Sequence, residues 1–131
     1  MEEKSIVSIW IGRSEDEEKA QTLMEYTYDE DGDAIAPAFV QVYNMEDTYI
    51  DEDFVEVSFR PLSSSLTELL EGHSYWESIL PALLTRIGET LPFEANTMVL
   101  LYDYVYNGGV VEAVLDGVKL RYIGAVPFEE V

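Results

Sequence analysis

A turn made of aspartate and glutamate is the part of this chain that looks most like a metal site. It reads Asp29-Glu30-Asp31-Gly32-Asp33, with carboxylates at alternate positions. An EF-hand loop needs glycine at its sixth position and a bidentate glutamate at its twelfth. With Asp29 in first place, the glycine falls fourth and the twelfth residue is Val40, so the motif fails. The sequence therefore predicts a solvated acidic turn and no bound metal.

Catalytic chemistry has few candidate residues. His73 is the one histidine, there is no cysteine, and no G-x-S-x-G nucleophile motif is present. Zinc would need several histidine or cysteine ligands. We expect His73, which follows Gly72 at a helix end, to lie at a cap or on the surface. Carboxylate pairs such as Asp51 and Asp53 leave a small two-carboxylate hydrolase as an alternative, but we expect no catalytic residue, metal or cofactor.

The charge balance is the strongest signal in the sequence. The chain has 27 acids against 7 bases, a net charge of -20. Residues 1–60 hold 17 of the acids and 4 of the bases, so the N-terminal half dominates the field. Such a field repels nucleic acid and membrane and attracts a basic partner. Solubility or adaptation to high salt is the alternative use of an acidic surface.

Length and composition indicate one globular domain over residues 1–131. A hydrophobic fraction of 47% supports a core, so the chain is not a disordered acidic tail. The absence of cysteine fits a reducing cytoplasm. We recognise no secretory signal at the N-terminus, and the apolar runs are too short to span a bilayer. The sequence leaves the oligomeric state open.

The spacing of apolar residues predicts both strands and helices. Alternation and turn signals predict strands over residues 5–11, 54–59, 97–106, 110–115 and 118–126. Capping boxes predict helices that begin at Ser14, Ser65 and Ser74, and a further short helix lies within 35–45. Pro61 ends the second strand, and Pro81 either kinks the last helix or divides it in two.

These elements define an α+β fold. We expect a mainly antiparallel sheet of about five strands with helices packed on it. Two short turns, Asn107-Gly108-Gly109 and Asp116-Gly117, would join the last three strands into a C-terminal three-stranded meander.

Several aromatic residues are candidates for a contact surface. Trp10 lies on the mixed face of the first strand, where it is either a lid over the sheet or a partly exposed anchor. Tyr102, Tyr104 and Tyr106 share one face of a predicted strand. That face is either core or a wettable contact surface, since tyrosine is favoured at interfaces.

Several short motifs together resemble those of a known family. They are Val7-Ser8-Ile9-Trp10-Ile11-Gly12, the acidic helix that follows, the segment from Tyr49 to Glu56, and Ser74-Tyr75 at a helix start. They are similar to the immunity 22 family, small bacterial proteins encoded beside polymorphic toxins. The likeness covers most of the N-terminal half and thins after about residue 90. It implies a cytoplasmic protein that binds and neutralises a toxin, and it carries over no catalytic residue.

The resemblance and the charge together predict a binding protein. Toxins of such systems are often nucleases, whose basic clefts suit an acidic partner. We expect occlusion of the toxin's substrate cleft, with no direct nucleic acid binding and no membrane partner. An acidic scaffold or assembly subunit is the alternative. The candidate toxin-binding residues are Asp29, Glu30, Asp31, Asp33, Asp47, Asp51, Glu52, Asp53, Trp10, Tyr102 and Tyr104.

Overall fold

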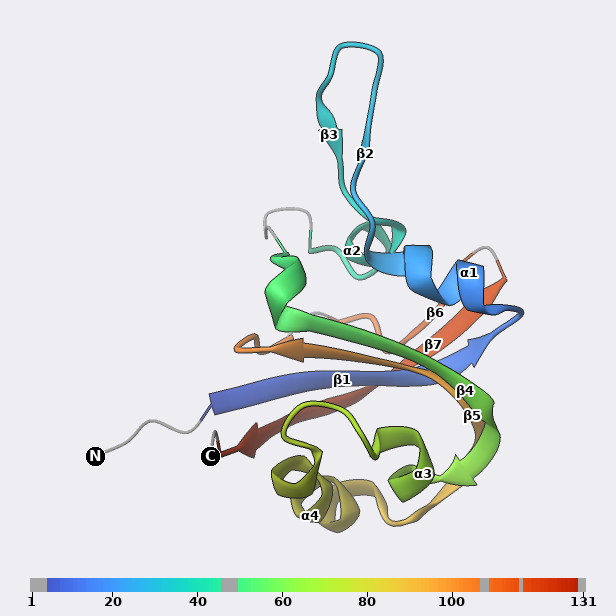
Figure 1. Cartoon of the computed structure of the whole chain (residues 1–131), viewed down its shortest axis with the longest axis vertical. Helices are drawn as coiled ribbons and strands as arrows, with labels where there is room; N and C mark the ends of the chain where they lie inside the picture. The colour runs from blue at the N-terminus through green and yellow to red at the C-terminus, as the bar shows by residue number, and fades with distance from the viewer. Residues whose placement is uncertain (1–4, 46–49, 107–108, 116, 130–131) are drawn as a thin grey trace.

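Figure 1 shows the computed structural model of the protein, which describes residues 5–45, 50–106, 109–115 and 117–129. In chain order the elements are β1 (Ser5–Ser14), α1 (Glu17–Gln21), the 3-10 helix η1 (Thr22–Met24), β2 (Thr27–Tyr28), β3 (Ala34–Ile35), α2 (Ala38–Val42), the 3-10 helix η2 (Glu52–Phe54), β4 (Val55–Ser65), α3 (Leu66–Leu70), α4 (Trp76–Ile87), β5 (Thr90–Tyr102), β6 (Glu112–Leu115) and β7 (Val118–Phe128).

The main sheet is antiparallel and has the strand order β4-β5-β1-β7-β6. This confirms the predicted α+β class and the sheet of five strands. Strand β1 lies at the centre, where Val7 pairs with Tyr102 on one side and with Val126 on the other. Six consecutive residues of β1 are buried, as expected for a central strand with both faces covered.

The last three strands are not neighbours as the meander prediction placed them. Strands β6 and β7 form a hairpin, but β1 separates β7 from β5. β5 begins earlier than predicted, at Thr90, and ends at Tyr102, because Asp103 has φ +58 and turns the chain away. A turn signal shows where the chain reverses direction, but it does not show which strands pair. The apolar residues on both faces of β1 favour the central position, between β5 and β7.

Helices cover both faces of the sheet. One core cluster packs α3 and α4 against residues such as Ile9, Leu100 and Val126. The other packs η1 and α2 against Trp10 and Val99. Each fully buried leucine or isoleucine contributes about 1.5–3 kcal/mol, so the two apolar layers hold the sheet from both sides.

Local signals differ in how well they marked the element ends. The Ser65 side chain accepts from Glu68 N at 3.2 Å, so the predicted cap of α3 is confirmed. The cap predicted at Ser14 is wrong, because Asp16 caps α1 by accepting from Lys19 N at 2.8 Å. The cap predicted at Ser74 is also wrong: α4 begins at Trp76 without a side-chain cap.

The two prolines do not end their elements. β4 continues past Pro61, which lies at a register shift on the sheet edge, where a missing N–H removes no ladder bond. Pro81 lies inside a single helix, α4.

Strands β2 and β3 form a separate two-stranded hairpin. It projects beyond the sheet, next to α2, with the predicted acidic turn at its tip (Figure 1).

Candidate functional site

An open groove connects the base of the projecting hairpin with the end of β5. Two adjoining depressions of about 460 and 210 Å³ share the residues Ile50 and Asp51. We call their combined surface the acidic groove. It is lined by Met24, Glu25, Tyr26, Tyr28, Ile50, Asp51, Glu52, Phe54, Val55, Leu101, Tyr102, Asp103 and Tyr104.

One hydrogen bond ties the second acidic loop to the stem of the hairpin. Ile50 N donates to the Tyr26 hydroxyl at 2.9 Å. Beyond it, Asp51 caps η2, since its carboxylate accepts from Asp53 N at 2.9 Å. Asp51, Glu52 and Asp53 are all exposed. The structure therefore places this acidic segment beside the hairpin and turns its carboxylates to solvent.

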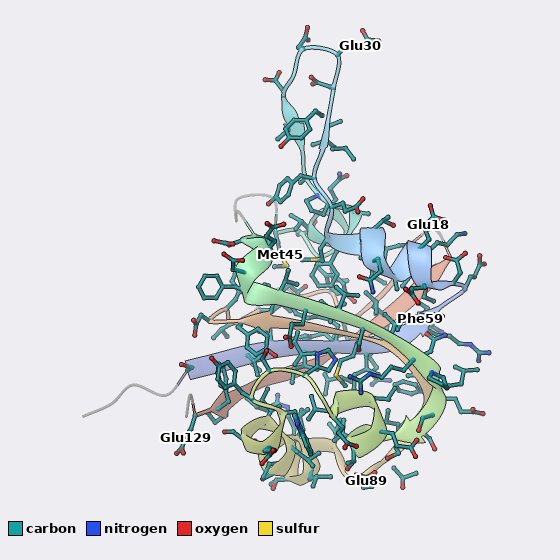
Figure 2. The ribbon with its side chains drawn as sticks, in the orientation of Figure 1. Glu18, Glu30, Met45, Phe59, Glu89 and Glu129 are labelled. Carbon is teal, nitrogen blue, oxygen red and sulfur yellow. The ribbon has the colours of Figure 1, made fainter. Side chains whose placement is uncertain are left out.

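The hairpin tip carries the other acidic segment. Asp29 accepts from the backbone N–H groups of Asp31 and Asp33, each at 2.9 Å, so its side chain shapes the turn. The carboxylates of Asp29, Asp31 and Asp33 lie within 4.8 Å of one another and are exposed. Figure 2 shows Glu30 at the far end of this hairpin, well away from the sheet. Such close like charges repel one another, and a cationic surface would relieve the repulsion.

Aromatic side chains stand at the rims of the groove. Tyr28 is 70% exposed and Phe54 is 45% exposed. Tyr104 is half-buried, and its carbonyl accepts from the Ser8 hydroxyl at 2.6 Å, which holds this segment against β1. The sequence prediction had missed Tyr28 and Phe54. The signal for both was adjacency, since Tyr28 precedes Asp29 and Phe54 follows Asp53.

Trp10 is not exposed on the surface of the described structure. It is fully buried, and its ring lies 4.8 Å from Phe39 and 5.7 Å from Tyr43, centre to centre. The side chain thus serves the core under α2, which corrects the prediction of a partly exposed anchor. Its Nε1 is buried without a hydrogen-bond partner among the described residues.

Tyr102 is also an unsuitable anchor, because it is 8% exposed and packs on the face beneath α3 and α4. Tyr106 packs on the opposite face, with Trp10. The predicted common face of the tyrosines is therefore wrong, because the strand ends between them. Of the remaining candidates, Asp47 lies outside the described residues.

A buried polar cluster lies between β4 and the loop before α4. His73 is 6% exposed, which corrects the prediction of a cap or surface residue. Its Nδ1 lies 3.1 Å from Glu56 Oε1 and its Nε2 lies 2.8 Å from the Ser58 hydroxyl. Glu56 also accepts from the Tyr102 hydroxyl at 2.7 Å and from the Ser74 hydroxyl at 2.6 Å. Its carboxylate is thus the acceptor that joins β4, β5 and the loop.

Burial and hydrogen bonding shift the ionisation of this cluster. Removal from water lowers the pKa of His73 below its usual range, against the opposing effect of Glu56. Burial alone would raise the pKa of Glu56, but hydrogen bonds, first from Ser74 and then from Tyr102, lower it overall. At neutral pH the cluster is therefore an uncharged imidazole against a carboxylate. Ser58, His73 and Glu56 are hydrogen-bonded in the same succession as the nucleophile, base and acid of a hydrolase triad. However, the histidine is buried, and the glutamate also accepts from Ser74 and Tyr102, so these contacts are suited to a structural role.

The fold and the groove define an acidic α+β protein with an open groove lined by carboxylates and aromatic rings. The profile of the family described as Immunity protein 22 matches residues 7–129, so the chain belongs to this family. The match confirms the resemblance seen in the sequence and extends it through β7. Membership supports a role in neutralising a toxin. No curated protein and no solved structure matches the chain at a significant level. Within the described residues, every helix is too short or too polar to cross a membrane.

Proposed function

We propose that this protein acts in the cytoplasm as one domain that binds a basic toxin, a nuclease domain, through the acidic groove. It inhibits the toxin by covering the substrate cleft and performs no catalysis of its own. The observation that carries this proposal is one groove lined by the acids Glu25, Asp51, Glu52 and Asp103 together with the exposed rings of Tyr28 and Phe54. The acidic tip of the β2–β3 hairpin projects beyond this groove (Figure 2).

The charge supports a partner with a basic cleft. A nuclease must attract phosphates, so its cleft presents a positive potential. A surface with net charge -20 is drawn to that potential over long range and raises the association rate. An inhibitor that fills the cleft with carboxylates then occupies the positions that phosphates would take.

Aromatic anchors would supply much of the affinity. Charge complementarity chiefly raises the on-rate and specificity, whereas buried aromatic contacts dominate measured binding energies. Phe54 lies next to the acids of η2, and Tyr28 lies beside those of the hairpin tip. We expect Phe54→Ala to weaken binding by about 2 kcal/mol or more, as is typical of a hot spot.

The main test compares two triple variants in binding to the toxin domain encoded beside the gene. The first carries Asp51→Asn, Glu52→Gln and Asp53→Asn; the asparagine at 51 keeps an acceptor for the turn. The control carries Glu71→Gln, Glu77→Gln and Glu129→Gln, which are exposed acids of the other half. Figure 2 shows Glu129 on the opposite side of the sheet from the hairpin. Calorimetry should show at least about tenfold weaker binding for the first variant and little change for the control.

Two outcomes would contradict the proposal. Equal losses in the two variants would mean that a diffuse field, with no localised site, attracts the toxin. No binding at all by the unmodified protein would favour an acidic scaffold unrelated to toxins. The nuclease assignment is tested separately by displacement: a single-stranded oligonucleotide held by the catalytically inactive toxin should be released as the inhibitor is added.

A further inference from the structure

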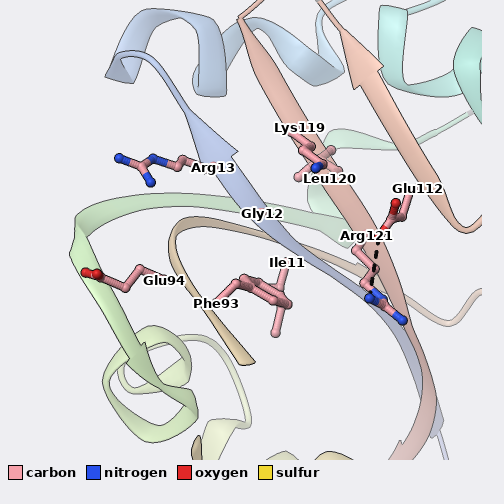
Figure 3. A pocket seen from close by; sticks show the side chains of 9 residues that line it. All are labelled: Ile11, Gly12, Arg13, Phe93, Glu94, Glu112, Lys119, Leu120 and Arg121. Carbon is pink, nitrogen blue, oxygen red and sulfur yellow. Dashed lines mark hydrogen bonds and ion pairs between the residues drawn. The ribbon is translucent and has the colours of Figure 1, made fainter. Parts of the chain in front are cut away.

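A second pocket, separate from the acidic groove, is lined by three basic and two acidic residues. It lies where β1 and β7 pair near their ends, between the curled β5 and the β6–β7 hairpin, and it has a volume of about 400 Å³ (Figure 3). This is within the range of small-molecule sites. Its lining residues are Ile11, Gly12, Arg13, Phe93, Glu94, Glu112, Lys119, Leu120 and Arg121.

Three of the seven basic residues of the chain line this one pocket: Arg13, Lys119 and Arg121. Arg121 Nη1 lies 3.4 Å from Glu112 Oε1, an exposed pair that neutralises part of its charge. The charged groups of Arg13 and Lys119 make no hydrogen bond or ion pair with any other residue that the structure describes. Among the described residues, these two cations have no acidic partner.

The register of the sheet makes this arrangement costly. Arg13 and Lys119 are directly opposite each other in the antiparallel pair β1–β7. Like charges at directly opposed positions destabilise a sheet. In a chain with 27 acids and 7 bases, two basic residues at directly opposed positions are unexpected. An anion bound between the two cations would turn the repulsion into two attractive contacts.

The floor of the pocket is apolar. Ile11 is fully buried, Phe93 is half-buried, and both belong to the cluster beneath α3 and α4. Figure 3 shows these two side chains together, with Arg121 to one side of them, Lys119 further along β7, and Arg13 extending outward from β1. At Gly12 the strands approach so closely that an added Cβ would lie 1.9 Å from Lys119 O. The glycine therefore lets the two strands approach closely beneath the pair of cations.

We propose that this pocket binds a small organic anion. A phosphate or carboxylate lies between Arg13 and Lys119, and an aromatic or aliphatic body rests on the exposed part of Phe93. Inorganic anions satisfy the cations alone and leave the exposed part of Phe93 in water, so they bind more weakly. The proposal does not rest on the acidic groove or on a toxin.

The test uses the full-length protein labelled with 15N, at physiological ionic strength so that the charge of distant acids is screened beyond about 8 Å. Phenyl phosphate should shift the amides of Gly12, Phe93 and Leu120 in a saturable way, with a dissociation constant of about 1 mM or lower. Inorganic phosphate should bind about tenfold more weakly. Benzylamine, with the same ring and the opposite charge, should cause no saturable shift.

Matched variants assign the binding to the two cations. Arg13→Gln with Lys119→Gln should weaken phenyl phosphate binding at least about tenfold. Lys19→Gln with Arg60→Gln removes the same charge elsewhere and should leave the affinity unchanged. Because the cations at 13 and 119 are exposed, the first variant should keep its amide spectrum outside the pocket. The proposal is overturned if phenyl phosphate causes no saturable shift, if it binds no better than inorganic phosphate, or if both double variants lose affinity equally.

Discussion

At the scale of single residues, Glu56 is the side chain on which most polar contacts converge. It accepts from Ser74 and Tyr102 and contacts His73, two of which are buried. Removing an acceptor leaves buried donors unsatisfied, which costs more than the bond itself gains. We expect Glu56→Ala to lower the free energy of unfolding by about 2–4 kcal/mol. Urea denaturation measures this, with the exposed Glu71→Ala as the control; similar small losses in both would show that the cluster does not support the fold.

The same cluster predicts a pH dependence. Because burial lowers the pKa of His73 in the folded state, the unfolded state takes up the proton first as pH falls through about 6.5. Stability from His73 is therefore present at neutral pH and decreases below about 6.5. The lowered pKa of Glu56 acts in the same direction, but only near and below pH 4.5. As the pH is lowered from about 7.5 to about 5.5, the urea midpoint of the unmodified protein should fall, and that of His73→Gln should fall less. If the two midpoints fall equally with pH, the histidine is not the cause.

At the scale of elements, the β2–β3 hairpin is the part that can be changed with least effect on the core. Tyr28 pairs with Ala34, and both are exposed, as is the turn between them. Replacing residues 29–33 with Asn-Gly would join the same pair through a two-residue turn. We expect unchanged stability and weaker toxin binding, measured by thermal denaturation and calorimetry. A variant that binds the toxin normally would remove the hairpin tip from the interface.

Elements defined by local patterns were predictable, and pairings between distant segments were not. Alternation around Val57 and the cap at Ser65 gave β4 and the start of α3, because both signals lie within a few residues. The insertion of β1 between β5 and β7 depends on pairings of residues 85 to 123 positions apart, for which a turn signal carries no information. For the same reason the sequence could not decide whether Trp10 is a lid over the sheet or a partly exposed anchor, since the helix that covers it could not be placed.

The same distinction between local patterns and distant contacts applies to the candidate site. Of its acids, Asp51 and Glu52 were predicted, because a run of carboxylates is visible in the sequence, whereas Glu25 and Asp103 were not. The groove was not, because it exists only where the Tyr26 hydroxyl meets the backbone of Ile50, 24 residues away. Its anchor Phe54 was assigned to a strand, whereas it ends η2 with an exposed ring.

At the scale of the whole molecule, a net charge of -20 must act on stability as well as on recognition. In the free protein the acids repel one another and oppose the compact state. Salt screens this repulsion, so the free protein should become more stable between low ionic strength and about 0.15 M, where the screening length is about 8 Å. Thermal denaturation of the free protein across this range measures the effect. A falling midpoint would mean that attractive pairs, such as Lys19 with Glu15, outweigh the repulsion.

Toxin association should respond to salt with the opposite sign. If the field steers a basic toxin toward the groove, screening removes the long-range attraction and slows the encounter, while contacts already formed are screened less. Stopped-flow measurements should therefore show an association rate that falls steeply with ionic strength and a dissociation rate that changes little. The triple variant at Asp51, Glu52 and Asp53 should show a shallower slope than the control at Glu71, Glu77 and Glu129, because the nearest charges dominate the final approach. If the association rate does not depend on salt while the stability of the free protein rises with salt, the acidic surface serves solubility or adaptation to high salt. Recognition would then rest on Tyr28, Phe54 and the shape of the groove.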